Sequence, residues 1–139
     1  RCKSTKLRTQ NKIMAQVLLV EDRENLRELF SELIQNYWLE ESELMVESCS
    51  FGQLQNQMSS KDFDTYVFNV GFNSSENYRL VKQLTESGNF ENRKIIVCCG
   101  ITPPEIQSSG TADIHYCKED RFVSDCLPLI VNNLSGRMS

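Results

Sequence analysis

The stretch FDTYVFNVGF, residues 63 to 72, combines a buried-strand pattern with one polar residue near its end. Its aromatic and β-branched side chains follow one another without polar alternation, which is typical of a parallel strand covered on both faces. Asn69 stands where this run should end. Open α/β sheets keep their ligand sites at the carboxyl ends of such strands, so the identity of residue 69 bears on function.

Four other segments predict strands, and helical patterns separate them. With residues 64 to 70, the strands are QVLLV (16 to 20), LMVESCS (44 to 50), KIIVCCG (94 to 100) and DIHYCK (113 to 118). The strongest helix pattern covers 23 to 37, where apolar residues recur about every 3.6 positions. Further helices are predicted at 51 to 58, around 78 to 84, at 105 to 109 after two prolines, and at 122 to 134.

Strands that alternate with helices predict an α/β fold with a parallel sheet and helices on both faces. For a chain of 139 residues we expect the flavodoxin-like (βα)5 architecture with strand order 2-1-3-4-5 and a short or irregular fourth helix. We expect one domain at 15–137, preceded by a basic flexible arm or linker at 1–14. Because the chain begins with Arg1, we also expect it to be a segment of a longer protein.

Composition limits the classes of function. No apolar run approaches the roughly 18 residues of a membrane span, so this segment should not contact a membrane. The net charge is -4 although residues 1–14 hold five bases and no acid, so the body of the chain is acidic and unsuited to direct nucleic-acid binding. Six cysteines without a CxxC pair, and a single histidine, argue against a metal cluster and for a reducing, cytoplasmic location.

Charged and polar residues follow the predicted strands at one edge of the sheet. Glu21 and Asp22 come directly after the first strand, and Lys118 closes the fifth. The two acids predict either a Mg²⁺ site or a simpler arrangement, in which Asp22 caps the next helix and Glu21 is solvated. Lys118 is either an ordinary surface lysine or a cation that neutralises Asp22 and points at Asn69.

Four segments in this order resemble the response-regulator receiver domain: VLLVED (17 to 22), FDTYVFNV (63 to 70), KIIVCCG and TADIHYCKED (111 to 120). The resemblance covers roughly residues 15 to 137. It implies that Glu21 and Asp22 match the Mg²⁺-binding acids and that Lys118 matches the conserved lysine. The chain departs from the family at four positions. Asn69 stands at the phosphoacceptor aspartate, Cys99 at the phosphoryl-contacting hydroxyl residue, His115 at the aromatic switch and Glu119 at the proline that usually follows the lysine.

These departures predict a degenerate receiver. A carboxamide is a poor nucleophile and forms no acyl phosphate, so Asn69 should not accept a phosphoryl group, and Mg²⁺ binding should be weak or lost. The amide can still hydrogen-bond Lys118 or Asp22 without adding charge. Cys99 is a weaker hydrogen-bond donor than a hydroxyl residue. His115 is either a switch whose charge changes near neutral pH or an edge histidine packed beside the fifth strand.

We therefore expect a non-catalytic pseudo-receiver of a two-component or phosphorelay system, which regulates a partner or an attached domain without aspartyl phosphorylation. The family resemblance implies an interaction surface near Ile114, Tyr116, Arg121 and Phe122. A sensor kinase, an output domain, another regulator or a second copy in a homodimer would bind there.

Two alternatives stay open from the sequence. A receiver phosphorylated elsewhere would use Ser74 or Ser75, which follow the third strand closely. A thiol redox sensor on the same fold would use Cys98 and Cys99. Neighbouring strand residues point to opposite faces, however, which makes a disulfide between these two cysteines strained.

Overall fold

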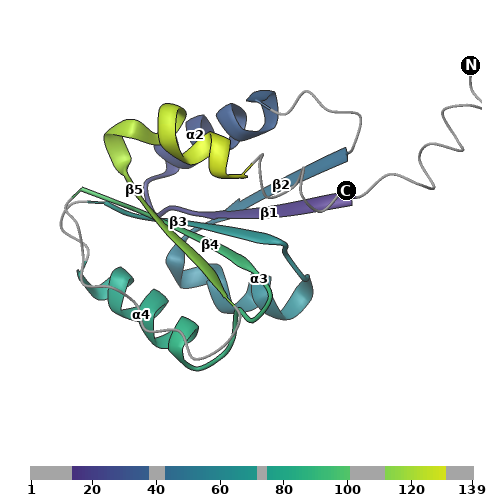
Figure 1. Ribbon diagram of the computed structural model, residues 1–139, viewed down its shortest axis with the longest axis vertical. Helices are drawn as coiled ribbons and strands as arrows, with labels where there is room; N and C mark the ends of the chain where they lie inside the picture. The colour runs from purple at the N-terminus through teal and green to yellow at the C-terminus, as the bar shows by residue number, and fades with distance from the viewer. Residues whose placement is uncertain (1–13, 38–42, 72–74, 101–111, 131–139) are drawn as a thin grey trace, which may run out of the picture.

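The computed structural model describes residues 14–37, 43–71, 75–100 and 112–130 (Figure 1). Residues 1–13 of the predicted arm, Ser74 and the predicted helix at 105–109 lie outside the described residues, as does the end of the last predicted helix. No helix in the described ranges is long and apolar enough to cross a membrane. The strands are β1 (Met14–Val20), β2 (Glu43–Cys49), β3 (Thr65–Gly71), β4 (Lys94–Cys99) and β5 (Asp113–Lys118).

The five strands form one parallel sheet of order β2-β1-β3-β4-β5. This order confirms the predicted fold class. Figure 1 shows α2 (Glu24–Tyr37) and the C-terminal helical turns over one face of the sheet, and α3 (Leu54–Ser60) and α4 (Ser75–Glu86) over the other. Because all the strands run in the same direction, their carboxyl ends lie along one edge, where the predicted site residues fall.

The ends of several elements differ from the sequence predictions. Met14, assigned to the arm, begins β1. The predicted helix at 51 to 58 starts as a 3-10 turn, η1 (Phe51–Gln53), and continues as α3. The last helix is irregular where it is described: a 3-10 turn, η2 (Glu119–Arg121), is followed by a π-helical turn, η3 (Phe122–Cys126), and then by α-helical residues 127–130.

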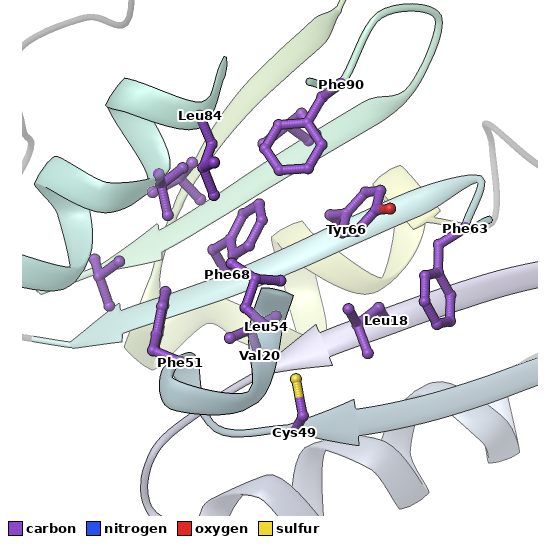
Figure 2. Packing of buried hydrophobic residues seen from close by; sticks show 14 of the residues in the cluster. Leu18, Val20, Cys49, Phe51, Leu54, Phe63, Tyr66, Phe68, Leu84 and Phe90 are labelled. Atoms are coloured by element: carbon purple, nitrogen blue, oxygen red, sulfur yellow. The ribbon is translucent and has the colours of Figure 1, made fainter. Parts of the chain in front are cut away.

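The sheet has a separate apolar core on each face. The core on the α2 face is formed by side chains from the sheet, from α2 and from the C-terminal helical turns. In it, Phe30 of α2 stacks on Phe122 of η3 at 4.3 Å between ring centroids. The α3–α4 face holds an aromatic cluster (Figure 2). There, Tyr66 and Phe68 of β3 contact Phe90, which comes from the turn between α4 and β4.

The end of β3 is irregular at the position that matters most for function. The register against β4 shifts between Asn69 and Gly71, and Gly71 has a φ of +76°. This left-handed conformation favours glycine because it has no Cβ. Gly71 also accepts a backbone hydrogen bond from Gly100 at 2.9 Å, so the strand end stays attached to β4.

Phe90 should be an anchor of the aromatic core although it lies outside any helix or strand. It is fully buried and lies 4.7 Å from Tyr66 between ring centroids. We expect Phe90→Ala to lower the free energy of unfolding by about 3–5 kcal/mol, since it empties a ring-sized space. Chemical denaturation measures this loss. The control is Leu29→Ala on the exposed side of α2, which should cost roughly 1 kcal/mol or less; equal losses would contradict the assignment.

Candidate functional site

Parallel strand register brings four of the predicted site residues to one edge. Val20 of β1 pairs with Phe68 of β3, so Glu21 and Asn69 follow side by side. Asn69 pairs with Cys98 of β4, and Cys99 pairs with Lys118 of β5. The site therefore spans the sheet from β1 to β5.

Glu21 is a buried carboxylate with its charge neutralised inside the protein. Glu21 is 1% exposed, and its backbone N–H donates a hydrogen bond to the backbone oxygen of Cys49 at 2.9 Å. The carboxylate accepts four hydrogen bonds: three from Arg23 (backbone N 2.8 Å, Nε 3.0 Å, Nη2 3.1 Å) and one from Asn69 Nδ2 at 2.6 Å. The expectation that Glu21 is solvated is wrong, because a buried charge requires this degree of pairing.

Arg23 links the carboxyl ends of β1 and β5. Its Nη2 also donates to Glu119 Oε2 at 2.7 Å, so one guanidinium bridges acids that follow β1 and β5. The guanidinium lies over Gly71, where an added Cβ would be 3.5 Å from Nη2. The hydrogen bond to Glu21, aided by Glu119 and opposed by burial, raises the pKa of Arg23 above its usual value. The cation is therefore permanent.

Asn69 serves as a donor in this arrangement. Because it faces a carboxylate, the atom 2.6 Å from Glu21 Oε1 is the amide nitrogen. The partner of the amide nitrogen is Glu21, and not Lys118 or Asp22, the two partners considered from the sequence. The other amide atom, Oδ1, is buried without a hydrogen-bond partner. Asn69 thus holds Glu21 in place and leaves one acceptor unsatisfied.

Asp22 is committed to contacts on the α3–α4 side. Its Oδ1 accepts from the backbone N–H of Phe51 at 2.8 Å, and its Oδ2 accepts from Asn77 Nδ2 at 3.1 Å. It therefore caps η1 and not the next helix, which corrects the simpler of the two sequence interpretations. Asp22 joins the ends of β1 and β2 to the first turn of α4.

Lys118 and Cys99 lie apart from the acids. Lys118 is exposed and, within the described residues, forms no salt bridge with Glu21 or Asp22. The prediction that it neutralises Asp22 is wrong, because Arg23 supplies the cation of the site. Cys99 is buried and its Sγ lies 3.8 Å from Cys117 O. Burial raises the pKa of the Cys99 thiol and the nearby Lys118 lowers it, with burial the larger effect.

The donor set does not fit Mg²⁺ as it stands. Magnesium requires carboxylate oxygens that are free to face the ion and its waters. Both oxygens of Glu21 are engaged by Arg23 and Asn69, and both oxygens of Asp22 accept hydrogen bonds. Among the described residues, no group of three or more His, Cys, Asp or Glu side chains could hold a metal ion. A dication at Glu21 would have to compete with Arg23 for the carboxylate.

The residues expected at an interaction surface do not share one face. Ile114 and Tyr116 pack against the α3–α4 core. Arg121 is exposed and pairs with Asp125 at 2.8 Å. Phe122 is 3% exposed because it stacks on Phe30, so its assignment to a surface is wrong.

His115 is half-buried on β5. Its Nε2 lies 3.0 Å from Asp113 Oδ1, which is close enough for an ion pair but without hydrogen-bond alignment. The contact is between neighbours on one strand and does not reach Glu21 or Asn69. The structure thus places His115 as a residue of the edge strand β5, away from the carboxyl-end site.

Sequence reasoning missed Arg23 and the partnership of Glu119. Arg23 was assigned only to the start of a helix, and Glu119 only to a missing proline. A base directly after two acids, together with an extra acid after Lys118, was the available signal. This signal could not be interpreted from the sequence, because it depends on the ends of β1 and β5 lying close enough for the Arg23 side chain to reach Glu119.

Comparison with known proteins gives the fold. No protein-family model matches the chain, and no curated protein matches it. Among solved structures, the chain is similar to the structure of a response regulator receiver domain (CheY-like) from Methylobacillus flagellatus, with a TM-score of 0.64 and 18% sequence identity. The match covers 88% of this chain and 99% of that one. At this identity the likeness establishes the receiver fold, and function must be argued from the residues.

Breaking the Arg23–Glu21 pair should be costly. We expect Arg23→Met to lower the free energy of unfolding by about 2–3 kcal/mol, because Glu21 would stay buried and unpaired. The Arg23 side chain is 46% exposed, which keeps the loss below that of a fully buried pair. Adding Glu21→Gln should restore part of it. Denaturation of these variants is compared with that of Arg121→Met, which breaks an exposed ion pair and should cost less stability. A loss no greater than that of this control would contradict the role of Arg23.

Proposed function

We propose that the chain is a pseudo-receiver, a non-catalytic signalling module that regulates a protein partner or an attached domain without aspartyl phosphorylation. The observation that carries this proposal is the internal cation at the strand ends. Arg23 binds the Glu21 carboxylate from one side while Asn69 binds it from the other. The Glu21 charge that a receiver would use for Mg²⁺ is thereby satisfied within the protein.

The chemistry of residue 69 supports the absence of aspartyl phosphorylation. An amide oxygen is neutral and forms no stable acyl phosphate. The hydrogen bond from Asn69 to Glu21 also depends on the amide nitrogen, since a carboxylate at this position would be a second acceptor only 2.6 Å from Oε1. Asparagine is thus the residue type that suits an arginine-neutralised Glu21, and aspartate is the type that suits a dication.

The fixed position of Arg23 supports a site that does not switch between charge states. Phosphoryl transfer depends on cations that neutralise developing charge, and a receiver takes that cation from solution. Here the cation is covalently attached and anchored at both ends by Glu21 and Glu119. A site with a permanent cation has one charge state, so we infer that it holds the edge of the sheet in one conformation and does not act as a phosphorylation switch.

The proposed partner is another protein: a sensor kinase, an output domain or another regulator, in the cytoplasm. The acidic composition beyond residue 14 disfavours direct binding of a nucleic acid. Lys118, Arg121 and Val123 are exposed side chains near the end of β5 and form the proposed contact region, in place of a surface that includes Phe122.

The test is acyl-phosphate formation from a small acyl-phosphate donor with Mg²⁺, measured by intact mass. We expect the native chain to gain no phosphoryl group. Asn69→Asp combined with Arg23→Ala restores an anionic nucleophile and removes the internal cation, so this double variant should be phosphorylated, and more fully than Asn69→Asp alone. The control is Asn92→Asp, which adds a carboxylate before β4 at the opposite edge of the sheet and should stay unmodified.

Two outcomes would contradict the proposal. Phosphorylation of the native chain on an acyl-forming side chain would show that the site still works as a receiver. A folded double variant that stays unmodified would show that Asn69 and Arg23 are not what prevents phosphorylation.

A further inference from the structure

Three thiols meet on the α2 face of the sheet, away from the site described above. Cys98 of β4 and Cys117 of β5 are register partners, and Cys126 belongs to η3. The Sγ atoms of Cys98 and Cys126 are 3.8 Å apart, and the side chain of Cys117 interacts with both thiols. All three are free and buried, with exposures of 0%, 6% and 0% for Cys98, Cys117 and Cys126.

This cluster differs from the pair that sequence reasoning named. Cys98 packs in the core on the α2 face, whereas Cys99 packs in the core on the α3–α4 face. The two cannot approach each other across the strand, as their alternation predicts. Cys99 therefore cannot be the partner of Cys98 in a redox pair. The thiols near Cys98 are those of Cys117 and Cys126.

The three thiols are electrostatically unequal. Hydrogen bonds donated by the thiols of Cys126 and Cys98 lower the pKa of Cys117 to about 4, with a smaller contribution from His115, while burial and Asp125 oppose the shift. The pKa values of Cys98 and Cys126 are raised by their hydrogen bonds to Cys117 and by burial. By contrast, burial raises the pKa of Cys49 to about 11. Cys117 is thus the thiol of the cluster that ionises most easily, and at 6% exposure it is also the least buried of the three.

We propose that Cys117 is a peroxide-oxidation site whose sulfenic acid is resolved by Cys126 to form a disulfide. The Cys117 thiolate attacks one oxygen of a hydroperoxide, the O–O bond breaks, and the leaving oxygen departs as water or an alcohol after taking up a proton. The Cys126 sulfur then forms the S–S bond and displaces water. Sulfur is oxidised by two electrons and the peroxide is reduced.

The backbone favours Cys126 over Cys98 as the resolving residue. A disulfide requires the two sulfurs to close to roughly 2.05 Å. Cys98 lies in a strand that is hydrogen-bonded to β3 and β5 on its two sides, so it resists displacement. Cys126 lies in a single π-helical turn, a geometry that readily changes to another helical form. Closing the bond would pull η3 toward β5.

Movement of η3 would reach other parts of the molecule. Phe122 begins η3 and stacks on Phe30 of α2, while Val123 and Arg121 are exposed beside it. Oxidation at Cys117 would therefore alter the surface at the end of β5 without using Glu21, Asn69 or Arg23. This makes the oxidation site independent of the phosphate chemistry argued above.

The experiment treats the folded native chain with hydrogen peroxide, alkylates the remaining thiols and maps the disulfides. Trypsin leaves Cys98, Cys99 and Cys117 on residues 95–118 and Cys126 on residues 122–137, and cleavage before Asp113 separates Cys117 from the other two. We expect a Cys117–Cys126 link. Alkylated, unoxidised Cys117 and Cys126, or a link between a different pair, would overturn the proposal.

Variants separate the two steps. In Cys126→Ser, the link should be lost and a sulfenic acid at Cys117 should be trapped by dimedone. In Cys117→Ser, both the link and the trapped adduct should be lost. Cys99→Ser, a buried thiol on the other face, should leave the link unchanged. If dimedone labels another cysteine of Cys126→Ser before Cys117, the assignment of the attacking thiol is wrong, and this result is independent of phosphorylation.

Discussion

The burial of the Glu21 carboxylate is the constraint on which the site depends. Glu21 follows a central strand and is 1% exposed, so its charge must be neutralised by the protein or by an ion. Arg23 provides that charge from two residues away, and Asn69 provides a donor from the neighbouring strand. Glu119 accepts a hydrogen bond from Nη2 of the guanidinium, and Gly71, which has no Cβ, leaves space for the guanidinium next to the end of β3. Each of these residues fits an internal cation.

This arrangement gives a single physical reason for two of the departures from the receiver pattern. Asparagine at 69 can donate to Glu21, whereas aspartate would repel it in the absence of a dication. Glutamate at 119 can accept from Arg23, whereas proline could not. In the proposed pseudo-receiver, a covalently attached cation takes the place that a diffusible one has in the receiver pattern, and the site keeps one charge state. That change is consistent with a module that presents a fixed surface to its partner.

The sequence predicted the architecture well because the fold is encoded locally. The apolar runs of β1, β3 and β4 are buried on both faces, and residues 113–118 form β5 with the predicted bounds. The position of Asn69 at the end of β3 followed from the same pattern. Side-chain partners were less predictable because they depend on distant elements. Phe122 was expected at the surface, but its ring stacks on Phe30 in the core. Lys118 was considered as the cation of the site, but the residue that binds Glu21 is Arg23. The cysteine cluster likewise joins residues from β4, β5 and η3, which no local spacing reveals.

The most direct test of the internal cation is the NMR signal of the Arg23 side chain Nε–H in the native chain, recorded with and without Mg²⁺. Its assignment comes from the spectrum of Arg23→Lys. We expect a resolved Nε–H signal that exchanges slowly with water and keeps its position as Mg²⁺ is added, because Glu21 holds the proton in a hydrogen bond. A signal that exchanges as fast as that of an exposed arginine, or one that moves and saturates with Mg²⁺, would contradict the claim that Arg23 neutralises the site.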